Sequence, residues 1–341
     1  MGPDRALLVT THDRALRKEL ERGDWAGRPL PPAAEAFFLK VAAYRKLEHL
    51  HARQNPMALS VDGATLHVER LEPPAGTSRG TVVFVPGTGT HVVAYVEFGC
   101  ALADQGFTVL AFDPRGPGRS SGPRGDFTIA EFVRDTVAVV RFAQRTCPGP
   151  HFLSGSSQGG IVAVYASTLL PELAGVIPQA FADLSDPESA ELLGKGTLAG
   201  RLKPVRALFP LLGRFLPTVP IPVSTYVNLG QESLGWTSAA QFLEDDPLGV
   251  PVYSLRATSD LSSAPPPKPF REIRHHILAI AAGNDRIFPL AFQKRQAKKL
   301  TNATVEMAVF EGAEHLLLNT QPLLVVPRVV EWLGRRVARA K

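Results

Sequence analysis

Short hydrophobic runs alternate with amphipathic stretches along most of the chain. The runs Thr81 to Val85 and Phe107 to Phe112 each lead into a loop rich in glycine and proline, and a helical pattern from about Val93 to Gln105 lies between them. This order predicts a strand, a helix and a second strand parallel to the first.

The same alternation continues toward the C-terminus. It predicts a helix near Ile129 to Arg145, a strand from His151 to Ser154, strands at Ile277 to Ala282 and Thr304 to Phe310, and a closing helix at Val325 to Ala338. Strands that alternate with helices form a parallel sheet, so the pattern indicates an α/β fold.

The N-terminal part has a different pattern. Residues 1–55 are predicted to form a helical extension, because Pro32 to His51 has apolar residues at helical spacing. This helix could form a dimer contact, a wall of a pocket or a separate cover. From Ser60 to Leu66 the chain predicts a β-hairpin, since Asp62-Gly63 supplies the turn between two β-prone runs.

A second change of pattern occurs over residues 184–270, where prolines cluster and short apolar helical pieces replace the strands. We interpret this segment as an inserted cap and residues 56–183 and 271–341 as the core domain. Within the cap, the segment from Leu192 to Thr225 contains basic and apolar residues but no acidic residue. Such a segment could contact a lipid surface, or its leucines could pack on the core while its charges face solvent.

Composition narrows the classes of protein. A chain of 341 residues with 45% hydrophobic residues can bury a large core, and its net charge of +5 without a long Lys/Arg run argues against a nucleic-acid partner. Cys100 and Cys147 are too few for a disulfide framework and lack the spacing of a zinc site. Neither a signal peptide nor an apolar run of about 20 residues is evident, so we expect a soluble, cytoplasmic protein.

The segment Gly155-Ser156-Ser157-Gln158-Gly159 has the pattern G-x-S-x-G, between a predicted strand and a predicted helix. A serine on such a tight turn needs a strained backbone, and the flanking glycines let neighbouring chain pass close. Ser157 is therefore the candidate nucleophile, with Ser156 as the alternative.

A serine hydroxyl needs a base, and the base needs a carboxylate that orients it. Asp285 follows one predicted strand and His315 follows the next, so both lie where the carboxyl ends of strands converge. The order Ser157, Asp285, His315 is that of nucleophile-elbow enzymes. Asp113, which also follows a strand, is the alternative acid, although its position suits hydrogen bonds to the adjacent loop better.

Two backbone N–H groups are candidates for stabilising a negative oxygen on the substrate. Gln158 begins the helix after the nucleophile, and Thr88 lies in the glycine-rich loop after Val85. A dinucleotide-binding loop is disfavoured there, because Val92 stands where its third glycine would be needed.

Together these residues resemble the α/β-hydrolase fold superfamily, in particular the monoacylglycerol lipase, lysophospholipase and serine-aminopeptidase-like group. The resemblance covers Ser60 to Ala338. Its motifs are Val85-Pro86-Gly87-Thr88-Gly89, Phe112 to Gly122, Gly155 to Gly160, Asp246-Pro247-Leu248 and the loops of Asp285 and His315. The chain departs from many relatives at Pro86, where they have histidine, and at Ser156.

The resemblance implies a mostly parallel, eight-stranded sheet with helices on both faces and an inserted helical cap. It further implies a serine hydrolase that cleaves medium or long acyl esters through an acyl-enzyme, with no cofactor and no metal. An amidase or peptidase that uses the same triad is one alternative. A non-catalytic binding protein of the same fold is another.

Overall fold

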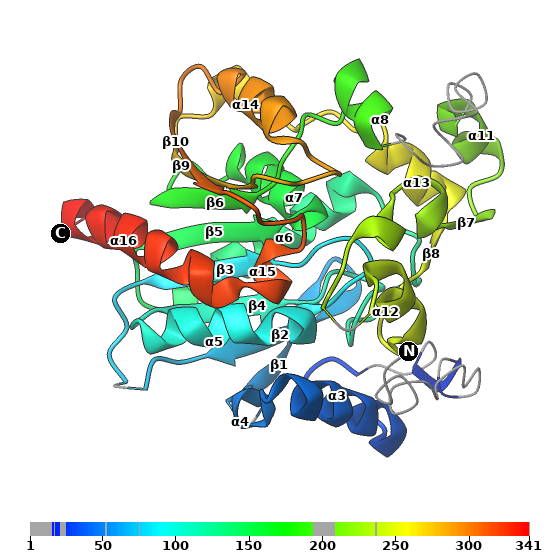
Figure 1. Ribbon diagram of the computed structural model, residues 1–341, viewed down its shortest axis with the longest axis horizontal. Helices are drawn as coiled ribbons and strands as arrows, with labels where there is room; N and C mark the ends of the chain where they lie inside the picture. The colour runs from blue at the N-terminus through cyan, green and yellow to red at the C-terminus, as the bar shows by residue number, and fades with distance from the viewer. Residues whose placement is uncertain are drawn as a thin grey trace.

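A central β-sheet with helices on both faces organises the protein (Figure 1). The computed structural model describes residues 16, 18–20, 25–51, 53–74, 76–193, 209–235 and 237–340. The strands of the central sheet are β1 (Pro56–Val61), β2 (Ala64–Leu71), β3 (Thr81–Val85), β4 (Thr108–Phe112), β5 (His151–Ser156), β6 (Gly175–Gln179), β9 (His276–Ala282) and β10 (Thr304–Phe310).

The order of the eight strands is β1-β2-β4-β3-β5-β6-β9-β10. Strand β2 is antiparallel to β1 and to β4, and the remaining neighbours are parallel. This confirms the mostly parallel, eight-stranded sheet. Strand β6 had no prediction of its own, because its five residues contain a glycine and a proline and show no clear pattern.

The helices are α3 (Pro32–Arg45), α4 (Glu48–His51), α5 (Val96–Asp104), α6 (Ile129–Thr146), α7 (Gln158–Ser167), α8 (Pro187–Leu193), α11 (Phe209–Phe215), α12 (Ala239–Asp245), α13 (Leu255–Leu261), α14 (Leu290–Lys298), α15 (Leu317–Thr320) and α16 (Pro322–Ala340), with short 3₁₀ helices η1 (Val92–Tyr95), η2 (Val223–Thr225), η3 (Leu229–Gln231) and η4 (Phe270–Glu272). Of these, α5, α6, α7 and α16 confirm predicted helices, whereas α14, between β9 and β10, had no prediction.

Two local predictions near the N-terminus have different outcomes. The β1–β2 hairpin turns at Asp62 and Gly63, with φ of 44° and 76°, as Asp-Gly predicts. The single helix expected over Pro32 to His51 is wrong, because the structure has α3 and α4 in its place. Lys46 adopts a left-handed conformation with φ of 58°, which ends α3.

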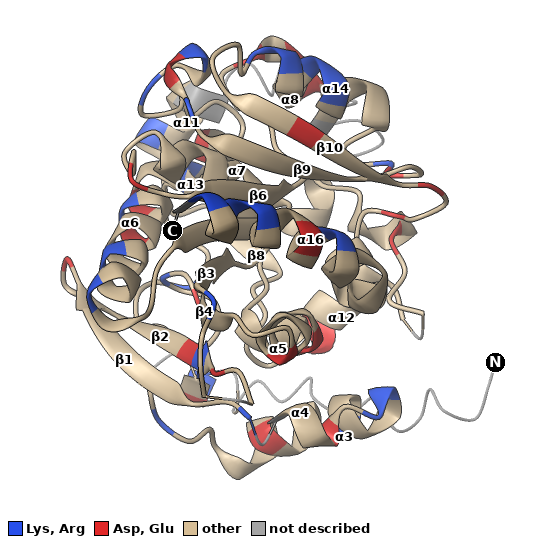
Figure 2. Cartoon of the chain, turned by 90° about the vertical axis from the view of Figure 1, so that its left-hand side faces the viewer, with Lys and Arg blue, Asp and Glu red and all other residues tan. Residues whose placement is uncertain are grey.

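The C-terminal helix α16 is fixed to the edge strand β10 by charge (Figure 2). Glu306 on β10 forms ion pairs with Arg328, Arg335 and Arg336 of α16 at 3.2, 2.7 and 3.3 Å. Burial opposes ionisation of this carboxyl, but the three arginines outweigh it and lower the pKa of Glu306. The cluster therefore favours the docked position of α16 over the edge of the sheet.

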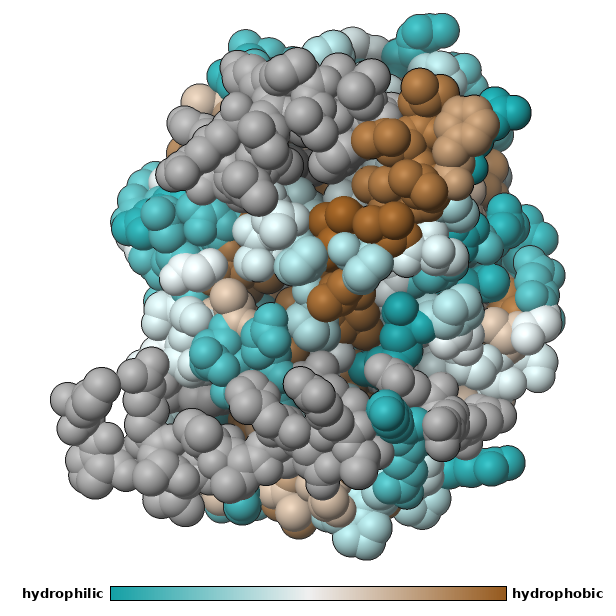
Figure 3. All heavy atoms as spheres, turned by 90° about the vertical axis from the view of Figure 1, so that its right-hand side faces the viewer, coloured by the Kyte–Doolittle hydropathy of each residue, from teal (hydrophilic) through white to brown (hydrophobic). Residues whose placement is uncertain are grey.

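Between β6 and β9 the chain forms helices α8, α11, α12 and α13 together with two short antiparallel strands, β7 (Pro220–Pro222) and β8 (Val252–Ser254). The sequence had shown no strand here, because β7 is Pro-Ile-Pro and both strands have only three residues. Figure 3 shows a band of hydrophobic side chains on this side of the molecule. Much of the basic segment, including Lys195, Arg201, Lys203 and Arg206, lies outside the described residues.

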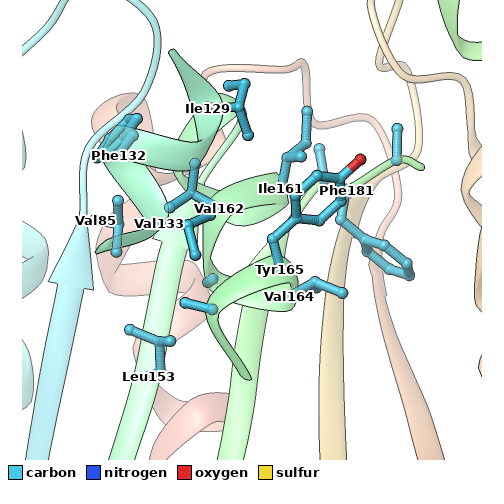
Figure 4. Close-up of a cluster of buried hydrophobic side chains, with 14 of the residues drawn as sticks. Val85, Ile129, Phe132, Val133, Leu153, Ile161, Val162, Val164, Tyr165 and Phe181 are labelled. Atoms are coloured by element: carbon cyan, nitrogen blue, oxygen red, sulfur yellow. The ribbon is translucent and has the colours of Figure 1, made fainter. Parts of the chain in front are cut away.

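Helices α6 and α7 cover one face of the sheet (Figure 4). The side chains drawn there include Ile129, Phe132 and Val133 of α6, Ile161, Val162 and Tyr165 of α7, and Val85 and Leu153 of strands β3 and β5. All of these side chains are buried. Burial of this apolar surface is the main stabilising term for the layer, at about 25 cal/mol per Å².

Helices α5 and α16 cover the opposite face, where Trp332 of α16 is completely buried. Its ring meets Phe152 of β5 with centroids 6.2 Å apart and lies over Gly175 of β6. A Cβ atom at Gly175 would be only 2.3 Å from the indole ring. Glycine at this position is therefore required by the packing of α16.

We expect Gly175→Ala to lower the free energy of unfolding by about 1–3 kcal/mol, because the added methyl overlaps the Trp332 ring in a well-packed core. Urea denaturation measures this change. Gly230→Ala is the matched control, since nothing lies within 4 Å of a Cβ atom there. Equal losses of stability in the two variants would contradict the packing argument.

Candidate active site

Ser157 lies on a sharp turn between the end of β5 and the start of α7, with φ of 55° and ψ of −118°. This conformation is strained for a residue with a side chain. The flanking glycines permit the turn: a Cβ atom at Gly155 would lie 2.2 Å from the Gly159 carbonyl oxygen, and one at Gly159 would lie 2.2 Å from the Val85 carbonyl oxygen. The G-x-S-x-G pattern thus has a steric cause.

The side chains of Ser157, His315 and Asp285 form a continuous hydrogen-bonded chain. His315 Nε2 lies 2.9 Å from Ser157 Oγ, and His315 Nδ1 lies 2.9 Å from Asp285 Oδ2. The other carboxylate oxygen of Asp285 accepts hydrogen bonds from the backbone N–H groups of Ile287 and Phe288 at 2.9 and 2.7 Å. The structure therefore brings together three residues that are far apart in sequence.

Asp113 occupies a different position from Asp285. Its carboxylate accepts backbone hydrogen bonds from Val92 and Arg119, each at 2.8 Å. The side chain therefore ties the Arg119 loop to the start of η1, as its position in the sequence had suggested. His315 pairs with Asp285 and not with Asp113.

The surroundings of His315 favour its protonated form. Burial alone would lower the pKa of His315, but the charge and hydrogen bond of Asp285 outweigh burial, and the pKa is raised above its usual 6.5. Glu232 adds to the increase. The Phe288 ring stacks on the His315 imidazole, with ring centroids 5.6 Å apart and an angle of 19° between the ring planes. This contact limits rotation of the imidazole.

Gln179, at the end of β6, supports both the serine turn and the histidine. Its backbone oxygen accepts from Ser157 N–H at 2.7 Å, and its side-chain amide donates to the His315 carbonyl at 3.1 Å. Its side-chain oxygen accepts from Ser156 Oγ at 2.6 Å. The Ser156 hydroxyl is thus directed at Gln179, whereas that of Ser157 is directed at His315. Sequence reasoning missed Gln179 because β6 was not predicted.

The loop that contains Thr88 lies directly against the serine turn. A Cβ atom at Gly87 would be 3.6 Å from Ser157 Cβ, and Thr88 and Ser157 line the same pocket. Tyr253 of β8 joins this loop to Gln158: its hydroxyl accepts from Gly89 N–H at 2.7 Å and donates to Gln158 Oε1 at 3.3 Å. Tyr253 is a further supporting residue that no sequence motif indicated.

A second buried contact links the same loop to the inserted segment. His91 Nε2 lies 2.8 Å from Asp246 Oδ2, and both side chains are almost fully buried. Burial alone would lower the pKa of His91, but Asp246 outweighs it and raises that pKa. The pair fixes the glycine-rich loop relative to the end of α12.

A pocket of about 510 Å³ opens at Ser157 and His315. This volume is within the range of small-molecule sites. Its walls include the glycine-rich loop with η1, the start of α5, and the segment that follows His315. The inserted segment contributes Leu229, Leu234 and Phe242, and helix α3 contributes Phe38 and Val41. The N-terminal helix is therefore part of the pocket wall, which was one of the three roles left open by the sequence.

Glu232, also from the inserted segment, places a carboxylate beside His315. It is only 2% exposed, its Oε2 has no hydrogen-bond partner in the described structure, and it interacts with the His315 backbone N–H. Burial raises the pKa of Glu232. In the part of the chain that is described, no group of three His, Cys, Asp or Glu side chains could hold a metal ion. None of the described helices is long and apolar enough to cross a membrane.

A mostly parallel eight-stranded sheet with a serine on the turn between β5 and α7 defines an α/β-hydrolase. The chain belongs to the serine aminopeptidase S33 family, whose model matches residues 76–322. It is a lipase- or esterase-like serine hydrolase.

Similar proteins agree with this assignment. A monoacylglycerol lipase of Mycolicibacterium smegmatis is 26% identical over 265 residues, which cover 75% of this chain and 88% of the relative. Among solved structures, a soluble variant of monoglyceride lipase from Saccharomyces cerevisiae, in complex with a substrate analogue, has a TM-score of 0.67 at 20% sequence identity. The match covers 83% of this chain and 95% of the yeast chain. The monoacylglycerol lipase of Paleococcus ferrophilus has a TM-score of 0.61 at 22% identity, with 80% and 99% covered.

We expect Glu232→Gln to move the acidic limb of the pH profile of kcat/KM toward lower pH. The Glu232 charge raises the pKa of His315, so its removal lets the neutral imidazole persist at lower pH. Steady-state rates with a soluble ester from pH 5 to 9 measure the limb.

The control is Glu311→Gln, which removes an exposed charge four residues before His315 that contributes to the pKa shift of neither His315 nor Glu232. A shift of equal size in both variants, or a shift of the Glu232→Gln limb to higher pH, would refute this role of Glu232.

Proposed function

We propose that the protein cleaves carboxylic esters with medium or long acyl chains, such as those of monoacylglycerols or lysophospholipids. Ser157 acts as nucleophile, His315 as general base and then acid, and Asp285 as the residue that orients His315. The observation that supports this most strongly is the chain of two 2.9 Å contacts from Ser157 Oγ through His315 to Asp285.

In the first half of the reaction, Ser157 Oγ attacks the ester carbonyl carbon while its proton passes to His315 Nε2. The N–H groups of Thr88 and Gln158 stabilise the negative oxygen of the tetrahedral intermediate. The intermediate collapses, the bond to the alcohol oxygen breaks, and the alcohol leaves with the proton from His315.

In the second half, water gives a proton to His315 and its oxygen attacks the acyl carbon. The bond to Ser157 Oγ then breaks, the serine regains a proton from His315, and the carboxylic acid leaves. Asp285 holds the Nδ1–H tautomer of His315 throughout and stabilises the positive imidazolium. No metal or cofactor takes part in this mechanism.

The lining of the pocket favours esters over the peptides that the family name suggests. A free amino terminus is recognised by carboxylates that are accessible and unpaired. The one acidic residue among the described lining residues is Glu97, which is paired with Arg45 at 2.7 Å, and Glu232 beside His315 is only 2% exposed and is not part of the lining. Apolar side chains such as Val93, Leu229 and Leu243 suit an acyl chain instead.

We also propose that residues 184–270 act as a cap over the core domain of residues 56–183 and 271–341. Leu234, Phe242 and Leu243 of this segment line the pocket, and Tyr253 and Asp246 join it to the glycine-rich loop. The cap thus shapes the pocket and at the same time supports the loop of Thr88.

We expect Ser157→Ala to lower kcat/KM for p-nitrophenyl esters by at least about 10³-fold and to abolish labelling by a fluorophosphonate probe. Ser156→Ala is the matched control and should keep most of the activity, because its hydroxyl is directed at Gln179. Thermal unfolding checks that both variants are folded. Full activity of Ser157→Ala would overturn the proposed mechanism.

A lipid surface is the partner that we propose for the cap. Leu211, Phe215 and Leu216 of the α11 region are exposed, Phe215 by 70%, and they belong to the segment Leu192 to Thr225 that has basic residues and no acidic ones. An apolar face next to positive charge suits an anionic membrane surface, which is also where a long-chain ester would be found.

Accordingly, the double substitution Phe215→Asp and Leu216→Asp should weaken binding to phosphatidylglycerol vesicles by at least about fivefold. Two apolar side chains are then replaced by negative charges, which the anionic lipid repels. Vesicle co-sedimentation measures the binding. The control is the pair Leu323→Asp and Leu324→Asp on α16, which are also exposed. Equal binding of the two double variants would exclude α11 as the contact.

A further inference from the structure

We infer that helix α3 is the wall against which the acyl chain of the substrate lies, and that Val41 sets the acceptable chain length. The inference rests on the proposed ester hydrolysis. Helix α3 ends at Arg45, whereas the family model begins at residue 76, so this wall comes from a part of the chain outside the region that defines the family.

Aromatic contacts hold α3 against the elements around Ser157. The Phe38 ring meets His91 of the glycine-rich loop edge-to-face at 5.3 Å and 80°, and Phe37 contacts Phe242 of α12 at 6.3 Å. Both phenylalanines are buried. Such pairs stabilise an interface beyond the area that they bury, so α3 is packed against both the loop of Thr88 and the proposed cap.

A polar contact fixes the C-terminal end of α3. Arg45 Nη2 forms an ion pair with Glu97 at 2.7 Å and donates to the Asn319 carbonyl at 2.8 Å. Asn319 lies in α15, four residues after His315, and its own side-chain amide donates to the Ala94 carbonyl at 2.9 Å. Burial lowers the pKa of Arg45 although Glu97 opposes the change, as expected for a guanidinium held in a partly closed site.

Three of the five α3 residues that line the pocket are apolar, and the other two, Tyr44 and Arg45, lie at the C-terminal end of the helix. Phe38, Val41 and Ala42 line the pocket that contains Ser157, and Val41 is only partly buried, so it borders open space. Leu39, two residues earlier, is 47% exposed and is not part of the pocket lining. An apolar wall that faces the nucleophile matches a hydrocarbon chain, whose binding is driven by removal of apolar surface from water.

The test is Val41→Trp, which fills the pocket from the α3 side. We expect the ratio of kcat/KM for p-nitrophenyl laurate to that for p-nitrophenyl acetate to fall by at least about tenfold. Leu39→Trp adds the same side chain to the outer face of the same helix and should keep the wild-type ratio. Val41→Ala should raise the ratio, and it keeps the test valid if the tryptophan variant does not fold.

A binding measurement separates this inference from the proposed function. In the Ser157→Ala background, Val41→Trp should weaken binding of a dansyl-labelled C11 fatty acid, whereas Leu39→Trp should not. Absence of ester turnover by the wild type would overturn the proposed function. The binding measurement would still test whether α3 contacts the acyl chain. An unchanged chain-length ratio and unchanged binding in Val41→Trp would overturn the inference.

Discussion

The strained turn at Ser157 is the constraint on which the rest of the site depends. A left-handed backbone at a residue with a side chain costs about 1–3 kcal/mol, and here it is held by Ser157 N–H donating to Gln179 and by the first turn of α7. Close approach of the backbone at Gly155 and Gly159 makes the turn possible. The turn places Oγ within hydrogen-bond distance of His315, and the groups around it come from loops, from the end of β6, from α3 and from the inserted segment.

Those groups are fixed by buried polar contacts. Asp285 is held by two backbone N–H groups, and Asp113 by two others, so each carboxylate is satisfied without facing water. Tyr253, Asp246 and Glu232 come from the segment between β6 and β9, yet each contacts the core of the site. The inserted segment therefore contacts the glycine-rich loop and His315 as well as lining the pocket.

The same pocket also depends on the N-terminal extension. Helix α3 contacts His91 of the glycine-rich loop through Phe38. It also contacts the Asn319 carbonyl, in the segment after His315, through Arg45. The family model matches residues 76–322, which contain strands β3 to β10 and the turn at Ser157 but neither β1, β2 nor α3. Helix α3 lies outside this matched region, so the acyl-chain wall that we propose there is not specified by the family model.

The sequence by itself determined much of the core: its patterns predicted strands β3, β4, β5, β9 and β10 and helices α5, α6, α7 and α16, because buried strands and amphipathic helices have distinct patterns. The motif and chain order also selected Ser157, Asp285 and His315 as candidates. Only the tertiary structure decided the existence of β6 with Gln179, the contacts of Tyr253 with Gln158 and of Glu232 with His315, and the place of α3 in the pocket wall. These depend on contacts between residues distant in sequence, and a local pattern does not specify which distant partner a side chain meets.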